Sequence, residues 1–205
     1  MSAPYSMLRR LLCLCCALGW VAPMASARSF STVVIDAGHG AHDFGCQEGY
    51  LFEKHLALDV ARRLQRYLSS RGIRNVMTRS RDYFVPLSGR AAIGNGVSDS
   101  IFVSVHVNDS SNTSASGVET FYYSGEGAAL ASAVHRQIMA HTNHGGNRGV
   151  KNARFFVLRH SVRPAILVET GFISNTRDRQ RLRDPAYREA MARCIGNGII
   201  EFRRR

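Results

Sequence analysis

Apolar residues form two kinds of pattern along the chain, a spacing of four residues and short continuous runs. Leu56, Val60, Leu64 and Leu68 are spaced by four, which is typical of the buried face of an amphipathic helix, and Gly72 then ends the pattern. Short runs of almost entirely apolar or β-branched residues predict buried strands. The predicted helices cover residues 56–71, 87–93, 130–139 and 186–202, and the predicted strands cover residues 32–35, 74–78, 100–107, 117–123, 155–158 and 165–168.

Strands and helices alternate along most of the chain. Such alternation is typical of an α/β fold, in which a mostly parallel, twisted sheet carries helices on both faces. With 205 residues and 45% hydrophobic content, the chain is long enough for one sizeable core. The pattern therefore predicts a single α/β domain.

The start of the chain has the pattern of a secretory signal peptide. Arg9 and Arg10 precede an uncharged apolar run over 11–22, and Ala25 and Ala27 place small residues before a cleavage point. The run is shorter than the roughly 20 residues that cross a bilayer. We therefore predict that residues 1–27 are removed after Ala27, and that residues 28–205 form an exported domain in the periplasm or outside the cell. No later run is long enough to span a membrane, so we expect no transmembrane segment in the mature form.

The chain is strongly basic, with 27 Lys and Arg against 15 Asp and Glu and a net charge of +12. This balance favours polyanionic partners, which for an exported protein are wall polymers, lipopolysaccharide or anionic lipid. Nucleic-acid binding would need a recognisable module or a basic stripe interleaved with aromatic residues, and the sequence has neither. We therefore expect no nucleic-acid partner, and interpret the dense basic patch over residues 177–193 as a solvated helix face.

Cysteine usage excludes a disulfide scaffold. Cys13, Cys15 and Cys16 lie in the predicted signal peptide, which leaves Cys46 and Cys194 in the mature chain. Whether these two pair stays open. Cys46 is interpreted as an ordinary loop thiol, because the sequence carries no reactive cysteine motif and no Gly-x-Ser-x-Gly elbow.

Three residues with reactive side chains stand at the ends of predicted strands. His39 follows the first strand, His106 lies near the end of the third, and Glu169 directly follows the last. In open α/β sheets the carboxyl ends of parallel strands share one edge, and the active site lies beyond it. We therefore expect the three side chains to meet in one crevice.

Imidazole nitrogen and carboxylate oxygen together suit Zn²⁺, and a catalytic zinc takes three protein ligands while a fourth position stays open. His39, His106 and one acid would make such a set. Glu53 is a candidate, because a loop that begins at His39 leads to it and can return over the strand ends. An acid in the first turn of a helix is equally expected, since the helix dipole favours it there. Both interpretations of Glu53 stay open at this point.

Four short motifs contain these residues. They are VVIDAGHG at 33–40, FEK at 52–54, SVHVN at 104–108 and LVETGFISN at 167–175. In content, order and spacing they resemble the four motifs of the zinc-dependent N-acetylmuramoyl-L-alanine amidases, the type 3 amidases of the cell wall. The resemblance spans roughly residues 32–202 and includes supporting segments around Arg79 and Arg90.

The resemblance implies a role for each reactive residue. His39, Glu53 and His106 would hold Zn²⁺, and Glu169 would be the catalytic carboxylate. The implied reaction is hydrolysis of the amide between the lactyl group of N-acetylmuramic acid and the L-alanine of a peptidoglycan stem peptide, in cell-wall remodelling or cell separation. Peptidoglycan would thus be the substrate. Zinc would polarise the amide carbonyl and activate water, while Glu169 transfers the proton to the leaving amine.

Two neighbouring positions bear on this implied site. Asp36 has two equal interpretations, since it can orient a ligand imidazole or cap the turn that follows the first strand. Val107 stands where a smaller alanine is usual in the family, so we expect the wall of the site to be slightly altered.

Two other functions would use similar residues or a similar fold. A zinc carboxypeptidase would also use two histidines and two acids, but it would show a His-x-x-Glu pair, and His39 is followed by His42 instead. A metal-free wall-binding module would have lost one of the four key residues, and all four are present.

Some division amidases of this family carry an extra helix between the second histidine motif and the glutamate motif, and it plugs the metal site until a partner withdraws it. Here that stretch is filled by predicted elements, by a polar loop over 109–116 and by a Gly-rich turn over 145–149. We therefore predict that no activator is obligatory. The alternative is that a loop side chain such as Glu126 reaches the metal as a fourth ligand.

Overall fold

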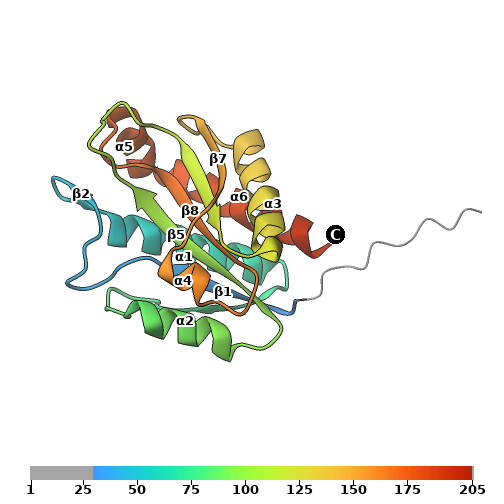
Figure 1. Ribbon diagram of the computed structural model, residues 1–205. Coiled ribbons are helices and arrows are strands. Elements are labelled where there is room, and N and C mark those ends of the chain that lie inside the picture. Colours follow the sequence, from blue (N-terminus) through green and yellow to red (C-terminus); the bar gives the residue numbers. More distant parts are fainter. Residues whose placement is uncertain (1–29, 205) are drawn as a thin grey trace, which may run out of the picture.

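A six-stranded sheet in the order β4-β1-β5-β8-β6-β7 forms the centre of the protein (Figure 1). The computed structural model describes residues 30–204. The strands are β1 (Thr32–Ala37), β4 (Arg74–Met77), β5 (Ser100–Asn108), β6 (Val118–Tyr122), β7 (Asn147–Asn152) and β8 (Ala165–Phe172), and a separate antiparallel pair consists of β2 (Gln47–Glu48) and β3 (Leu51–Phe52). Every neighbouring pair in the large sheet is parallel except β6 with β8.

Helices cover both faces of the sheet. On one face, α1 (Glu53–Ser70), α3 (Gly125–His141) and α6 (Pro185–Arg203) enclose the main core, whereas α2 (Leu87–Gly96) and α4 (Phe156–Arg159) cover part of the other face. A further helix, α5 (Thr176–Arg183), follows β8. The predicted class, an α/β domain with a mostly parallel sheet and helices on both faces, is confirmed.

The central strands form where the sequence is most continuously apolar. Every residue of β8 is buried, and seven of the nine residues of β5 are buried, as expected for strands covered on both faces. Along β5 the side chains alternate, so that Val103 and Val105 join the main core while Phe102 packs on the opposite face.

The long helix α1 forms as its periodicity predicts. Leu56, Val60, Leu64 and Leu68 are all buried against the sheet and α6. Gly72 adopts a φ of 68°, and its N–H donates to the carbonyl of Ser69. This left-handed residue ends the helix in the manner typical of glycine.

Three segments differ from the sequence-based expectations. The predicted strand over 155–158 is wrong, because most of it belongs to α4; four apolar residues are too few for periodicity to separate strand from helix. The predicted Gly-rich turn over 145–149 is wrong in its second half, where the polar edge strand β7 begins. The helix α5 buries Leu182 as its one apolar side chain, so hydrophobic spacing did not predict it.

The basic patch over residues 177–193 lies on α5 and α6, which agrees with its interpretation as a helix face. Within the described range, no helix is long and apolar enough to cross a membrane. The predicted signal peptide over residues 1–27 lies outside the described residues and stays a prediction.

The packing of α3 on α6 generates a stability prediction. A Cβ added at Gly198 of α6 would lie 2.4 Å from the Cα of Val134 on α3. Gly198→Ala should therefore lower the free energy of unfolding by about 1–3 kcal/mol, measured by urea denaturation. Gly96→Ala, at an open position in α2, is the matched control and should be neutral or stabilising by up to about 1 kcal/mol. Equal effects of the two substitutions would contradict this packing.

Candidate metal centre and active site

The reactive side chains meet at the carboxyl edge of β1, β5 and β8. His39 follows β1, while His106 on β5 and Glu169 on β8 are direct partners in the strand register. All three line one cleft. An added Cβ at Gly38 would lie 2.4 Å from Cε1 of His106, so the glycine leaves room for the imidazole ring. The sequence-based expectation that these residues share a crevice is confirmed.

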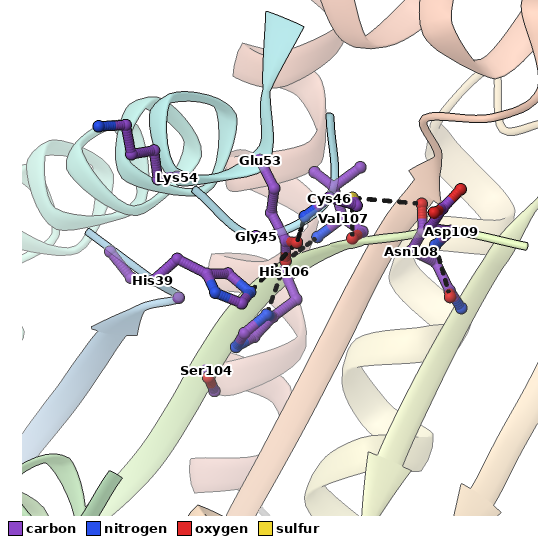
Figure 2. A network of polar contacts seen from close by, with 12 residues as sticks. His39, Gly45, Cys46, Glu53, Lys54, Ser104, His106, Val107, Asn108 and Asp109 are labelled. Carbon is purple, nitrogen blue, oxygen red and sulfur yellow. Dashed lines mark hydrogen bonds and ion pairs between the residues drawn. The ribbon is translucent and has the colours of Figure 1, made fainter. Parts of the chain in front are cut away.

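Glu53, the first residue of α1, lies between the two imidazoles (Figure 2). Its Oε1 is 2.7 Å from Nδ1 of His106, and its Oε2 is 3.1 Å from Nε2 of His39. One donor atom from each of the three residues lies within 4.8 Å of the others, so the group can hold a metal ion. The loop from His39 to Glu53 does return over the strand ends, as one of the two interpretations of Glu53 required.

Backbone contacts fix the Glu53 carboxylate. It accepts hydrogen bonds from the N–H of Val107 at 3.0 Å and from the N–H of Cys46 at 2.9 Å. Gly45 adopts a φ of 66°, and a Cβ there would lie 2.4 Å from Oε2 of Glu53. The loop can therefore close over the carboxylate because residue 45 has no side chain.

Asp43 orients one imidazole, and sequence reasoning missed it. Nδ1 of His39 is 2.8 Å from Oδ1 of Asp43, which also accepts a hydrogen bond from the Gly45 N–H at 3.1 Å. With Nδ1 bound to this carboxylate, Nε2 of His39 is left to face Glu53. A carboxylate behind a histidine in this way fixes the tautomer and ring orientation of a metal ligand. The short separation of His39 and Asp43 in the sequence was the signal that could have indicated this contact.

Asp36 contacts neither imidazole through a hydrogen bond. Its buried carboxylate accepts from Oγ1 of Thr78 and Oγ of Ser104, both at 2.6 Å, and from Nη1 of Arg90 at 2.8 Å. Burial opposes ionisation, but Arg90 and the two hydroxyls outweigh it and hold the pKa of Asp36 below its ordinary value. Asp36 therefore acts on the turn after β1 through Arg90. This agrees better with the interpretation that it caps the turn than with the one in which it orients a ligand imidazole.

Two buried arginines hold that turn. Arg79 donates to the carbonyl of Gly38 at 2.6 Å and to the carbonyl of Lys54 at 2.8 Å, and Arg90 donates to the carbonyl of His39 at 2.6 Å. His39 has a φ of 61°, in the left-handed region that a residue with a side chain seldom adopts. The arginines stabilise this conformation and tie the turn to the start of α1.

The charges at the centre depend on one another. Burial lowers the pKa of His106, but its hydrogen bond to Glu53 and the charge of that carboxylate outweigh burial and raise it to about 9. Burial raises the pKa of Glu53, but the hydrogen bonds from His106 and His39 outweigh it and hold the pKa well below its ordinary value. The carboxylate thus stays ionised beside the His106 imidazole.

Glu169 differs from the other carboxylates of the cleft. Burial raises its pKa to about 8, and its Oε2 is buried without a hydrogen-bond partner among the described residues. A buried polar atom without a partner is costly, so such an atom marks a place for a ligand or water. A carboxyl group that titrates near neutral pH is suited to accept and return a proton.

The cleft has a volume of about 680 Å³ and one apolar wall. This wall consists of Phe84, Val85, Leu87, Phe155, Phe156 and Val157, from the segments around α2 and α4. Hydrophobic periodicity could not indicate these residues as site residues. Val107 also lines the cleft, in agreement with its expected place in the wall.

The two cysteines of the described chain are free thiols. Sγ of Cys46 donates to the carbonyl of Val107 at 3.1 Å, while Cys194 is buried on α6. Burial raises the pKa of the Cys46 thiol, which makes it a poor nucleophile, as expected of an ordinary loop thiol.

Comparison with known proteins shows to which family the chain belongs. The model of a protein family described as N-acetylmuramoyl-L-alanine amidase matches residues 33–201. The chain belongs to this amidase family. The resemblance inferred from the four motifs is thereby confirmed.

Two proteins of Bacillus subtilis align with most of this chain. The chain is 39% identical over 203 residues to the uncharacterized protein YqiI of Bacillus subtilis (strain 168), covering 96% of this chain and 98% of YqiI. It is 35% identical to the N-acetylmuramoyl-L-alanine amidase LytC of the same organism, covering 84% of this chain but only 36% of LytC. The chain therefore spans nearly all of one relative and about a third of another.

Solved amidase structures share the fold. The N-acetylmuramoyl-L-alanine amidase AmiC2 of Nostoc punctiforme superposes with a TM-score of 0.82 at 40% identity, covering 85% of this chain and 97% of that one. The catalytic domain of CwlV from Bacillus (Paenibacillus) polymyxa gives a TM-score of 0.81 at 32% identity, covering 84% of this chain and 98% of that domain.

The arginines around the His39 turn generate a second stability prediction. Arg90→Met removes the cation that faces the buried Asp36, so it should lower the free energy of unfolding by about 3–5 kcal/mol. Arg66→Met, at an exposed position on α1, is the control and should change it by less than about 0.5 kcal/mol. Calorimetry or denaturant titration gives both values, and a loss below about 1 kcal/mol for Arg90→Met would contradict the role of the ion pair.

Proposed function

We propose that this protein is a zinc-dependent N-acetylmuramoyl-L-alanine amidase that hydrolyses the bond between the lactyl group and L-alanine in peptidoglycan. We assign His39, Glu53 and His106 as the zinc ligands and Glu169 as the catalytic carboxylate. The observation that carries the proposal is the approach of these four residues in one cleft. Family membership and the named amidases among the relatives support it.

The donor set fits zinc. Two imidazoles and one carboxylate are the borderline ligands that zinc accepts, and three protein ligands leave a position for water or substrate. When bound, zinc would polarise the scissile carbonyl and make the attacking water more acidic. The unpartnered Oε2 of Glu169 lies in the same cleft, where a polar ligand would satisfy it.

The residues of this chain then have separate tasks. Glu169 in its ionised form takes the proton from the attacking water and gives it to the leaving amine. Asp43 keeps Nε2 of His39 turned toward the site. The apolar wall that includes Phe84 and Phe155 offers a surface on which sugar and peptide groups can pack.

The same donors would also serve a zinc carboxypeptidase, which trims the stem peptide instead. The spacing of His39 and His42 and the amidases among the relatives favour the lactyl amide as the bond cleaved. A metal-free wall-binding module is disfavoured because all four key residues are present and converge.

We infer that the protein acts on the wall from outside the cytoplasm, in the periplasm or beyond the cell. The basic composition suits an anionic wall, and a relative in Staphylococcus aureus is named a probable cell wall amidase. The predicted signal peptide over residues 1–27 would provide export.

We also propose that no activator is obligatory. Between His106 and Glu169, α3 packs on the face opposite the cleft and β7 pairs with β6, so neither covers the candidate zinc site. Glu126 lies with Asp99 and Ser100 near the opposite end of the sheet, so the alternative in which it reaches the metal is wrong. One relative, the CwlD amidase of Clostridioides difficile, was solved in complex with the GerS lipoprotein, so partners do occur in the family.

Digestion of purified sacculi tests the reaction. Protein that lacks residues 1–27, added alone, should release stem peptides that begin with L-alanine, and mass spectrometry of the products should show the freed lactyl carboxylate. Glu169→Gln should reduce release by at least about a hundredfold, because the proton-transfer group is lost. Trimmed peptides on intact lactyl amides would indicate a carboxypeptidase. Release only after addition of a cell extract would refute independence from an activator.

Metal analysis tests the ligand set. The purified protein should hold about one zinc per chain, and His39→Ala or His106→Ala should lose most of it because each removes one of three ligands. Glu169→Gln should retain zinc. His141→Ala, at an exposed position on α3, is the control and should also retain it. Full zinc content in both ligand variants would overturn the assignment.

A further inference from the structure

The row of side chains that contains His106 and Glu169 continues across the sheet. Glu169 pairs with His106 on one side and with Glu119 of β6 on the other. Directly opposed residues on neighbouring strands point to the same face. Glu119 therefore lies beside the catalytic carboxylate, one strand farther across the same face of the sheet.

Two cations from the edge strand β7 meet the carboxylate of Glu119. This residue is only 4% exposed, and its Oε1 accepts a hydrogen bond from Nε of Arg148 and lies 3.2 Å from Nζ of Lys151. One carboxylate faces two cations, so the cluster retains positive charge. In β7, both Arg148 and Gly149 stand opposite Glu119, which is the two-against-one arrangement of a β-bulge.

Aromatic rings place the two cations beside the cleft. Arg148 lies over the ring of Phe172, 4.9 Å from its centroid, and Lys151 lies 6.0 Å from the centroid of Phe121. Phe121 in turn packs edge-on against Phe155 of the apolar wall. The cluster thus borders the cleft at Glu169 and at Phe155.

The charged ends of both side chains remain available to a ligand. The side chain of Arg148 is 36% exposed and that of Lys151 is 42% exposed. Among the contacts of the described residues, Arg148 donates through Nε, which leaves its two terminal nitrogens as a planar pair of donors. Such a pair matches the two oxygens of a carboxylate.

We propose that Arg148 and Lys151 bind a free carboxylate of the stem peptide, on the leaving-group side of the scissile amide. This rests on the proposed amidase function. The choice of side follows from substrate chemistry, because the lactyl carboxyl is blocked as an amide before cleavage, whereas the stem peptide carries free carboxylates. Glu119 holds the two cations in place and acts as their positioning residue.

A pair of substrates that differ in one charge tests the proposal. Muropeptides with either a free carboxylate or a carboxamide on the residue after L-alanine are compared with wild-type protein, Arg148→Gln and Lys151→Gln. For the free acid, each substitution should raise KM by about tenfold and leave kcat nearly unchanged, as expected for loss of one hydrogen bond to a charged group. For the carboxamide, KM should already be raised in the wild type and should not rise further.

Controls separate substrate binding from effects on the catalytic carboxylate. Arg66→Gln on α1, on the opposite face of the sheet, should behave as wild type with both substrates. An equal loss on acid and carboxamide, or a fall in kcat alone, would overturn the subsite and show that Arg148 acts through Glu119 on Glu169. If Arg148→Gln does not fold, Lys151→Gln alone carries the comparison.

Binding without turnover distinguishes this proposal from the amidase assignment. Calorimetry of the free stem peptide with wild-type protein should show an affinity that falls about tenfold in Arg148→Gln. If neither substrate is hydrolysed but the peptide binds in this charge-dependent way, the proposed reaction fails and the carboxylate subsite stands. If both substrates are hydrolysed equally well and the peptide binds equally to all variants, the subsite fails and the amidase stands.

Discussion

The buried ion pair between Asp36 and Arg90 is the contact on which the geometry of the site depends. Asp36 belongs to β1, shortly before His39 in the sequence, and Arg90 donates from Nη1 to the Asp36 carboxylate and from Nη2 to the carbonyl of His39. Arg79 adds the link from the same turn to Lys54, the residue after Glu53. Two candidate ligands, His39 and Glu53, are thereby held by one buried charge network. A buried pair seldom adds net stability over apolar packing, so its value here lies in fixing a conformation.

Much of this arrangement could be read from the sequence because it follows from strand ends. His39, His106 and Glu169 stand where apolar runs stop, and parallel strands bring such stops to one edge. The same reasoning left Glu53 open, since an acid at a helix start has a local explanation that needs no ligand. Only the path of the loop, which closes over Glu53 at Gly45, separates the two explanations.

The features that the sequence did not predict depend on contacts or short segments without a regular hydrophobic spacing. Asp43 acts on His39 through a loop conformation in which Gly45 has a positive φ, and the short separation of the two residues in the sequence does not by itself define that conformation. Four apolar residues at the start of α4 resemble a strand as closely as a helix, because one turn of helix and one short strand have the same length in residues. The edge strand β7 is polar because one of its sides faces solvent, so it lacks the apolar run that marks β5 and β8.

The reversal of β6 against β8 has a consequence for how such a domain can diversify. Because β6 and β7 run against the other strands, they start at the edge of the sheet where β8 ends, and the loops that precede them, over residues 109–117 and 142–146, lie at that edge. His39 and His106 belong instead to strands that end there. Insertions before β6 or β7 would enlarge the rim of the cleft while the histidine-bearing turns keep their length. Length changes on one side of the cleft are thus separated from the turns that carry the histidines, so substrate range can evolve separately from the chemistry.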